Sequence, residues 1–326
     1  MTLTQDIRYL GVNDRDIDLF EGQYAVPNGI SYNSYVILDE KVAVLDTVDH
    51  RKSAEFLANL ERELAGRKVD YLVLNHLEPD HASSVGVFLE KHPEAQLVGN
   101  AKTFQMLPQF FDVDLSNVVK VKEGDVLSLG RHELHFVMAP MVHWPEVMMT
   151  YDSTDKVLFS ADGFGKFGAL DADEPWEDEA RRYYFNIVGK FGANVRSVLK
   201  KAEGLDIAMI CPLHGPALTD TIPEVIALYD LWSSYAPETD GVLVAYASLH
   251  GNTAAAANLL ADKLEQAGME VQRLDLARCD ASLALSEAFR YSKVVLASAS
   301  YNGGAVPCME DFLHHLLIKN YQKRTF

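Results

Sequence analysis

Four apolar segments of this chain each end in a turn that carries histidine or carboxylate side chains. Each segment is short enough to be a strand, and each turn contains Gly or Pro. The metal-capable residues in these turns are His76, Glu78, Asp80 and His81 in the first, then His143, Asp162 and His214. Such side chains form one site only if the strand ends meet, so the pattern requires a sheet-based fold with several strand ends at one edge.

The first of these turns is the densest, and it reads His-Leu-Glu-Pro-Asp-His over residues 76–81. This ordering should arise by chance in on the order of one in a hundred chains of this composition. In an extended loop, His76, Glu78 and Asp80 would point to one side, and His81 would face a second position nearby. We therefore interpret these side chains as metal ligands rather than as a polar surface loop.

The pattern of predicted elements changes at about residue 240. Before it, many strands with helices at intervals indicate a layered αββα sandwich. After it, three predicted strands alternate with three predicted helices, as in an open parallel sheet with crossover helices. The polar segment 236–241, which contains Pro and Gly, is typical of a linker. We predict one domain over residues 1–240 and a second over residues 241–326.

Composition excludes several classes of function. The chain has 29 Lys and Arg against 47 Asp and Glu, a net charge of −18, so nucleic acid and anionic membranes are poor partners. Residues 241–326 hold eight acids and eight bases, so the excess lies entirely in the first domain. The three cysteines form no CxxC pair. Neither a signal peptide nor an apolar run long enough to span a bilayer is present, and we expect a cytoplasmic protein.

A second candidate site lies in the second domain, between a predicted strand and a predicted helix. Its residues are Ser248, Leu249, His250, Gly251, Asn252 and Thr253. Free backbone N–H groups and the positive end of a helix dipole can bind an anion there. The loop lacks both the lysine of a triphosphate loop and the G-x-G-x-x-G of a dinucleotide site. It is either a phosphate loop or an ordinary helix-capping turn.

Another Gly-rich turn follows the third strand of this domain. It contains Ser300, Tyr301, Asn302, Gly303 and Gly304. Tyr301 could stack on a flat ring, while the residues after it bring backbone N–H groups close. In a sheet of order 2-1-3-4-5, the loops after strands 1 and 3 flank the switch point, where sheets of this kind bind their ligands. The positions of the two loops therefore agree with a single binding site, and each prediction strengthens the other.

The residues of the first domain resemble the metallo-β-lactamase fold, whose hydrolases typically carry H-x-H-x-D-H in the first loop. Here Glu78 replaces the second histidine. The full set then holds four imidazoles and three carboxylates, and added carboxylate favours harder ions and the ferric state over zinc. The complete pattern, and essentially the whole chain, resembles the flavodiiron proteins. The loop at 248–253 resembles the flavodoxin phosphate loop, with His250 where a hydroxyl residue is usual.

The resemblance to flavodiiron proteins implies a ligand set. One iron would be held by His76, Glu78 and His143, and the other by Asp80, His81 and His214, with Asp162 bridging the two. It also implies a fold, an αββα sandwich followed by a partial flavodoxin-like doubly wound parallel sheet. The implied cofactors are two Fe and flavin mononucleotide (FMN).

The same resemblance implies the activity and the partners. The reaction would be reduction of O2 to water, of NO to N2O, or of both. Electrons would come through FMN from a separate rubredoxin-like protein or flavin reductase, because the chain has no rubredoxin cysteines. The implied assembly is a head-to-tail homodimer or a dimer of dimers, in which one subunit's flavin lies beside the partner's metals.

Two other classes of function remain open. A zinc hydrolase of the same fold would use a metal-bound water as nucleophile. A binding module would hold its metals without turnover. A flavodoxin domain has five strands and three flavin loops, whereas three strands and two loops are predicted before Phe326. We therefore expect the chain to hold iron but to retain FMN poorly.

Overall fold

The computed structural model describes residues 1–326, and the chain forms two compact units. The first unit comprises Met1–Asp18, Val26–Glu174 and Asn194–Ile226. The second unit comprises Leu19–Ala25, Pro175–Ala193 and Ala227–Phe326. Residues 19–25, 175–193 and 227–239 therefore belong to the same unit as the residues after 240. The division into domains at residue 240 stays a prediction.

The first unit is built on two sheets. The larger sheet has the order β1-β6-β7-β8-β9-β10, with strands Ile7–Tyr9, Tyr35–Leu38, Val42–Leu45, Tyr71–Val73, Gln96–Asn100 and Val118–Val121. The smaller sheet has the order β11-β12-β13-β14-β15, with strands Val126–Ser128, Glu133–Met138, Met148–Asp152, Val157–Phe159 and Met209–Cys211. A further short pair joins β2 (Val12–Asp14) and β5 (Ile30–Tyr32).

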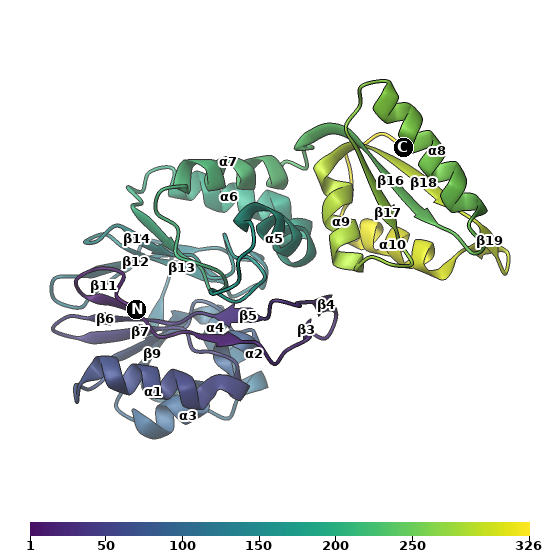
Figure 1. Cartoon of the computed structure of the whole chain (residues 1–326). Helices are drawn as coiled ribbons and strands as arrows, with labels where there is room; N and C mark the ends of the chain where they lie inside the picture. Colours follow the sequence, from purple (N-terminus) through teal and green to yellow (C-terminus); the bar gives the residue numbers. More distant parts are fainter. The chain divides into compact units, whose positions relative to one another are not determined.

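Helices cover the outer faces of these sheets (Figure 1). Helices α1 (Ser53–Leu64) and α3 (Val85–Lys91) lie along the larger sheet, and α6 (Gly192–Ala202) lies over the smaller one. The buried side of α1 presents Phe56, Leu57, Leu60 and Leu64, at the spacing of one helical face. The predicted αββα sandwich is therefore confirmed.

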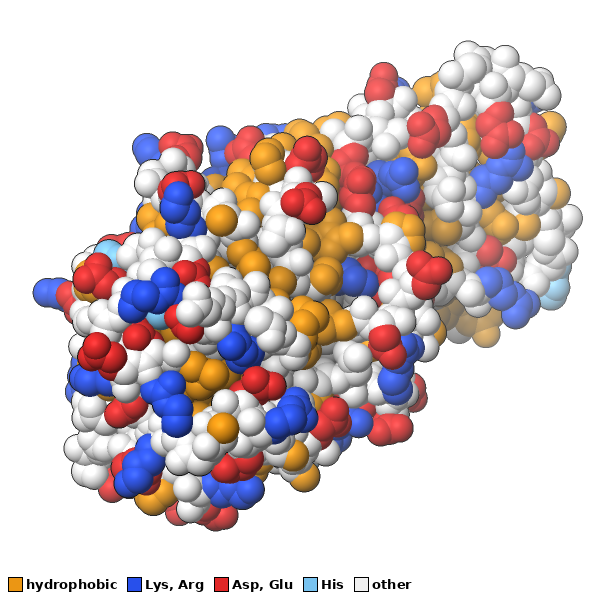
Figure 2. Space-filling view, turned by 60° about the vertical axis from the view of Figure 1, so that its left-hand side comes forward, with side chains coloured by type: hydrophobic (Ala, Val, Ile, Leu, Met, Phe, Trp, Pro, Cys, Tyr) orange, Lys and Arg blue, Asp and Glu red, His pale blue; other side chains and the backbone are white.

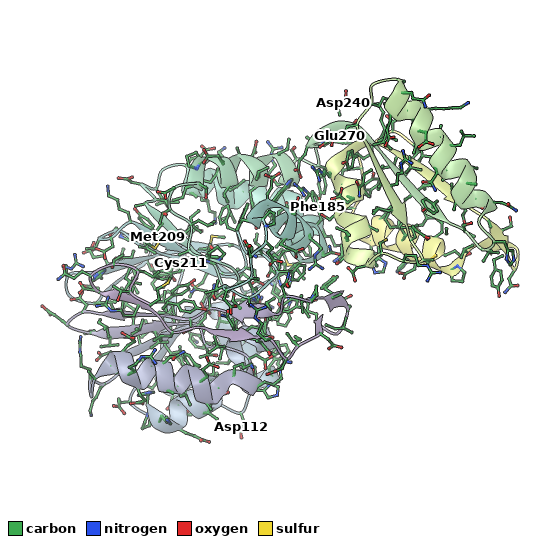
Figure 3. All side chains as sticks on the ribbon, in the orientation of Figure 1. Asp112, Phe185, Met209, Cys211, Asp240 and Glu270 are labelled. Carbon is green, nitrogen blue, oxygen red and sulfur yellow. The ribbon has the colours of Figure 1, made fainter.

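The core of the first unit lies between the two sheets. Tyr35 and Val73 of the larger sheet pack in one cluster with Phe136, Phe159 and Cys211 of the smaller one. The rings of Tyr35 and Phe159 are 5.3 Å apart, and Cys211 is labelled on β15 in Figure 3. Burying each large apolar side chain contributes roughly 1.5–3 kcal/mol, so this layer holds the two sheets together.

The second unit contains a parallel sheet of order β17-β16-β18, with strands Val271–Asp275, Thr239–Ala247 and Tyr291–Ser298. The helices that follow these strands in the chain are α8 (Asn252–Gln266), α9 (Ala281–Arg290) and α10 (Pro307–Ile318). This is the predicted alternation of three strands and three helices, in the first three places of a flavodoxin-like order. Beside β18, Thr325 forms an isolated parallel bridge with Lys293.

The helical segment over residues 176–202 is not one continuous α-helix. It becomes α5 (Trp176–Tyr183), a π-helical turn (Tyr184–Val188), a 3-10 turn (Gly189–Phe191) and α6. The π-helical turn places Phe185, labelled in Figure 3, in a stack on Phe289 with ring centroids 4.2 Å apart. At Gly192, a Cβ would lie 2.4 Å from a backbone oxygen, so a larger residue could not take its place.

Charged side chains of both signs are intermixed over the face drawn in Figure 2, with hydrophobic side chains between them. On this face the acidic residues are dispersed rather than gathered in one patch. None of the helices combines the length and the apolarity needed to cross a membrane.

Candidate metal centre

The four turns converge in the first unit at the ends of strands. His76 follows β8, Asp162 follows β14, and His214 follows β15, while His143 lies in the turn between β12 and β13. Strand β8 runs parallel to β7 and β9, and β14 runs parallel to β15, so their carboxyl ends share an edge. All seven predicted residues come together there.

The expectation of an extended first loop is wrong after Glu78. Residues Pro79–Ala82 form the short helix α2, with Pro79 at its first position, where a missing N–H costs nothing. Asp80 and His81 are therefore neighbours on a helix and do not alternate as they would in a strand. Both belong to one group of side chains with His214, whereas His76 and Glu78 belong to another with His143.

The side chains form two groups, which we call position A and position B. Position A contains His76, Glu78 and His143, and position B contains Asp80, His81 and His214. Asp162 lies between them. Its Oδ2 is 3.1 Å from His143 Nε2 and 3.3 Å from His76 Nε2, whereas its Oδ1 is 3.1 Å from His81 Nε2. One oxygen thus faces each position, which is the arrangement of a bridging carboxylate.

The spacing within each position fits ligands around an ion. Glu78 Oε2 is 2.9 Å from His143 Nε2 and 3.3 Å from His76 Nε2. Asp80 Oδ2 is 3.2 Å from the Nε2 atoms of both His81 and His214. Two ligands at right angles, each about 2.1 Å from a metal, lie about 3 Å apart. The donor atoms are therefore placed as coordination requires.

Unsatisfied polar atoms point to the same conclusion. Both carboxylate oxygens of Asp80 and both ring nitrogens of His81 are buried and make no hydrogen bond. Burying such groups without a partner costs about 1–3 kcal/mol each, more when they are charged. A metal ion at position B would satisfy Asp80 and one nitrogen of His81, so the residues present fit a bound metal.

The electrostatics of the cluster depend on opposite charges held close together. Burial alone would raise the pKa of Asp162, but the charges of His76 and His81 hold it well below its usual range. Burial would likewise lower the pKa of His143, yet hydrogen bonds to Asp162 and Glu78 raise it to about 9. The ionised carboxylates favour protons on the neighbouring imidazoles, and they would likewise favour a metal cation in place of those protons.

Residues outside the cluster orient the histidines. His76 Nδ1 lies 2.9 Å from Glu146 Oε1, which also accepts from the backbone N–H of Leu77 at 2.9 Å. His214 Nδ1 lies 2.7 Å from the backbone oxygen of Ser31. The sequence did not indicate Glu146 or Ser31 as part of the site, although Glu146 stands only three residues after His143.

Asp46 fixes the start of the first loop by hydrogen bonds to its backbone. Its buried carboxylate accepts from the backbone N–H and the amide of Asn75, both at 2.7 Å, and from the backbone N–H of His76 at 3.2 Å. Burial raises the pKa of Asp46 to about 6, against these hydrogen bonds. Asp46 itself has a φ of 55°, a backbone conformation uncommon outside glycine.

Trp144 packs beside position A. Its ring meets that of His76 edge-on at 5.4 Å and lies 5.6 Å from Phe110. The indole therefore shields one side of the histidine from solvent.

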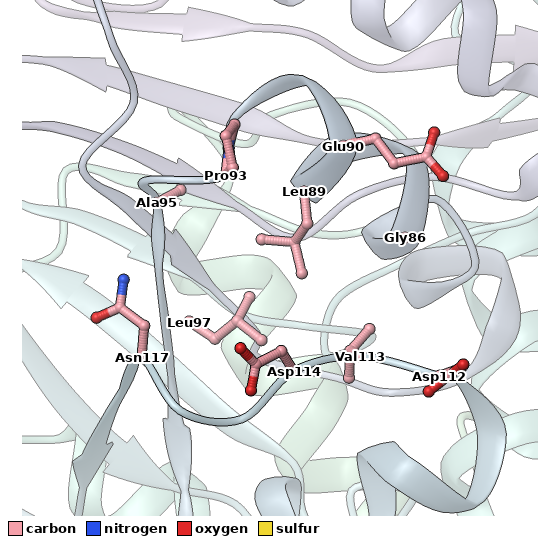
Figure 4. Close-up of a pocket in the computed structure, with 10 residues that line it drawn as sticks. All are labelled: Gly86, Leu89, Glu90, Pro93, Ala95, Leu97, Asp112, Val113, Asp114 and Asn117. Atoms are coloured by element: carbon pink, nitrogen blue, oxygen red, sulfur yellow. The ribbon is translucent and has the colours of Figure 1, made fainter.

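The pocket in Figure 4, of about 380 Å³, is not part of this site. It opens beside Ala95 and Asn117, where β9 and β10 begin, whereas the cluster lies where strands end. Its three carboxylates, Glu90, Asp112 and Asp114, are exposed, and no imidazole or thiol lines it.

The two predicted flavin loops leave neighbouring strands of the second unit. The first follows β16 and the second follows β18, and these strands pair in parallel. Gly251 precedes α8 with a φ of 90°, its N–H donates to Ser248 Oγ at 3.1 Å, and no acid lies in the first turn of the helix. Tyr301 is 48% exposed at the hairpin of β19 (Ser300–Tyr301) and β20 (Gly304–Ala305). An open helix N-terminus and an exposed aromatic ring fit a phosphate and a flat ring.

The fold and the site together define a class of protein. It is the class of β-lactamase-like proteins that combine a two-metal site, built from histidines and carboxylates, with a flavodoxin-like unit. A sequence profile described as ODP family beta lactamase matches residues 30–215, and one described as Flavodoxin matches residues 244–325. The chain belongs to this β-lactamase-like family and, within it, to the flavodiiron proteins.

Relatives and solved structures agree with this placement. The chain is 32% identical to the anaerobic nitric oxide reductase flavorubredoxin of Aliivibrio salmonicida, covering 96% of this chain and 65% of that one, so it spans about two thirds of such relatives. The flavodiiron protein of Giardia intestinalis superposes with a TM-score of 0.93 at 29% identity, covering 98% of this chain and 80% of that one. Rubredoxin oxygen:oxidoreductase of Desulfovibrio gigas gives 0.93 at 27% identity, covering 99% and 83%.

Proposed function

We propose that this protein is an oxidoreductase that reduces O2 to water, NO to N2O, or both, at a diiron site. The observation that carries the proposal is Asp162, with one buried oxygen facing position A and the other facing position B. The names of the relatives support both gases, since one is a nitric oxide reductase and another an oxygen oxidoreductase.

Position A would hold one iron and position B the other. Bound iron would bind and reduce the gas, and FMN would supply electrons one or two at a time. Three carboxylates among seven ligands favour iron over zinc at these positions. The chain itself fixes the ligands through Asp46, Glu146 and Ser31, and Trp144 keeps solvent away from His76.

The second unit would bind FMN through its two loops. Residues 248–253 would hold the phosphate at the N-terminus of α8, and residues 300–304 would lie along the ring system with Tyr301 stacked on it. Electrons would enter from a separate rubredoxin-like protein or flavin reductase. We propose a cytoplasmic head-to-tail homodimer, in which the flavin of one subunit serves the metals of the other.

Metal analysis with a visible spectrum tests this function. The full chain, expressed with ample iron, should contain about two irons per subunit. It should consume O2, or NO in the absence of O2, when a reduced flavin donor is supplied. Asp162→Ala should abolish consumption, whereas Glu133→Gln, which changes an exposed carboxylate on β12, should not. A colourless protein that holds only zinc and hydrolyses ester or amide substrates would instead establish the alternative, a zinc hydrolase.

A further inference from the structure

Position A and position B differ in the group that accepts a hydrogen bond from the Nδ1 atom of a histidine ligand. The Nδ1 atom of His76 contacts Glu146, a carboxylate, whereas the Nδ1 atom of His214 contacts a backbone carbonyl, that of Ser31. The distances are similar, 2.9 Å and 2.7 Å, and all four residues are buried. Only the charge of the acceptor distinguishes the two contacts.

The hydrogen-bond partners determine which ring nitrogen carries the proton. A backbone carbonyl can only accept, so His214 must donate from Nδ1. Glu146 Oε1 accepts from the backbone N–H of Leu77, so the same oxygen also accepts from His76, which donates from Nδ1. Each histidine thus uses Nδ1 for its outer contact and leaves Nε2 facing the cluster, where it can bind a metal.

An ionised acceptor makes an imidazole a stronger electron donor than a neutral acceptor does, because it draws the Nδ1 proton away from the ring. Glu146 is buried, so little solvent screens its charge. The Asn100 amide does not compete for the carboxylate, because its Nδ2 donates to the main-chain oxygen of Glu146 and leaves the carboxylate to His76 and Leu77.

We propose that Glu146 is a positioning residue that makes the two metal positions unequal, so that position A binds its ion more tightly than position B. The inference rests on the proposed two-metal function and adds to it an order of occupancy. Position A fills first and empties last. Glu146 acts through His76 and does not itself contact the ion.

Chelator competition on the full metal-loaded chain tests the proposal. With Co(II) as the metal and a chromophoric chelator, the wild-type chain should release its ions in two separate steps. Glu146→Gln keeps an oxygen that can accept from His76 and Leu77 but removes the charge. It should shift the later step to about 10- to 100-fold lower chelator concentration and leave the earlier step in place. Glu133→Gln is the matched control and should change neither step.

Two variants that each lack one histidine ligand show at which metal position Glu146→Gln weakens binding. In His214→Ala, which impairs position B, Glu146→Gln should still weaken the remaining tight ion. In His76→Ala, the same substitution should have no effect, since the histidine through which it acts is gone. Circular dichroism of each metal-free chain verifies that it is folded.

The outcomes separate the inference from the proposed function. If the wild-type chain releases two ions in one step, or if Glu146→Gln weakens both steps equally, Glu146 does not make the positions unequal and the inference is overturned. If the folded wild-type chain binds fewer than two Co(II) ions, the two-metal function itself fails, and the inference fails with it.

Discussion

His81 lacks the support that fixes the other buried histidines. Its Nδ1 is buried and makes no hydrogen bond, whereas the Nδ1 atoms of His76 and His214 each have an acceptor. Asp162, in contrast, faces both positions. We therefore expect Asp162→Ala to lose more iron than His81→Ala, with Asp162→Ala approaching complete loss.

Iron per subunit, measured by elemental analysis after identical purification, decides this prediction. Comparable losses from the two variants would show that Asp162 serves one ion rather than two. Glu133→Gln should keep the wild-type iron content in the same preparation.

Glu78 should determine which metal the site prefers. It is the one ligand that departs from the histidine-rich first loop of zinc hydrolases, and it lies 2.9 Å from His143 Nε2 at position A. Replacing it by histidine removes a carboxylate and adds a softer donor, so Glu78→His should raise the ratio of zinc to iron. The measurement is the zinc and iron content of both chains from iron-replete cells, and equal ratios would contradict the prediction.

The sequence predicted the residues that face the metal positions but not those that orient them. Each predicted ligand follows an apolar strand, and that local pattern is visible in a single sequence. Glu146 lies 70 positions from His76, and Ser31 lies 183 positions from His214. Such contacts depend on how strands come together in space, which a local pattern does not encode.

At the scale of elements, periodicity identified strands and helices more reliably than it identified short turns of helix. Helix α2 was read as extended because four residues are too few to show helical spacing. Helix α4 (Ala101–Phe110) was not predicted, since Pro108 lies inside it. Asn100 was an available signal, because its side chain accepts from the N–H groups of Lys102 and Thr103 as an N-cap does.

The turn before β12 carries a buried ionic contact between the sheets. His132 Nδ1 lies 2.9 Å from Asp152 on β13, and its Nε2 lies 3.3 Å from Asp6, which precedes β1. Arg131 also reaches Asp6 and Asp155. Burial alone would lower the pKa of His132, but the hydrogen bonds and charges of Asp152 and Asp6 outweigh it and raise that pKa.

This contact should make the stability of the first unit depend on pH. A raised folded-state pKa means that protonated His132 favours the folded chain at pH values below its ordinary pKa, and that this contribution is lost as pH rises through the folded value. His132→Gln should therefore cost about 1–2 kcal/mol at acidic pH and less at alkaline pH. Urea unfolding across pH measures it. His135→Gln on β12 is the matched control, since the His135 ring contacts Ser153 Oγ rather than a carboxylate.

At the scale of the whole molecule, the two kinds of cofactor should be separable. Gly251 has a φ of 90° at the proposed phosphate loop, and Gly268 has a φ of 84° at the other end of α8. Valine at either position carries a similar backbone penalty, roughly 1–2 kcal/mol. With FMN added in excess, Gly251→Val should bind FMN more weakly than the wild-type chain while iron content stays unchanged, and Gly268→Val should match the wild type in both. Loss of FMN from both variants alike would remove the specific role of the loop.

The proposed dimer predicts complementation between defective chains. Asp162→Ala should lack the metals and Gly251→Val the flavin, so neither should consume gas alone. Once dissociated and reassociated together, the mixture should regain part of the activity, because some dimers pair an intact flavin with a partner's intact metals. A mixture as inactive as its components would favour electron transfer within one subunit.

The position of Cys211 gives the molecule a built-in reporter. It lies in the core of the first unit, whereas Cys279 and Cys308 are partly exposed in the second. Burial raises the pKa of the Cys211 thiol far above its ordinary value, so alkylating reagents can modify it only when the sandwich opens. The rate of Cys211 alkylation, read by mass spectrometry of its peptide, would therefore time the opening of the metal-bearing half, while Cys279 and Cys308 could carry fluorescent labels without disturbing it.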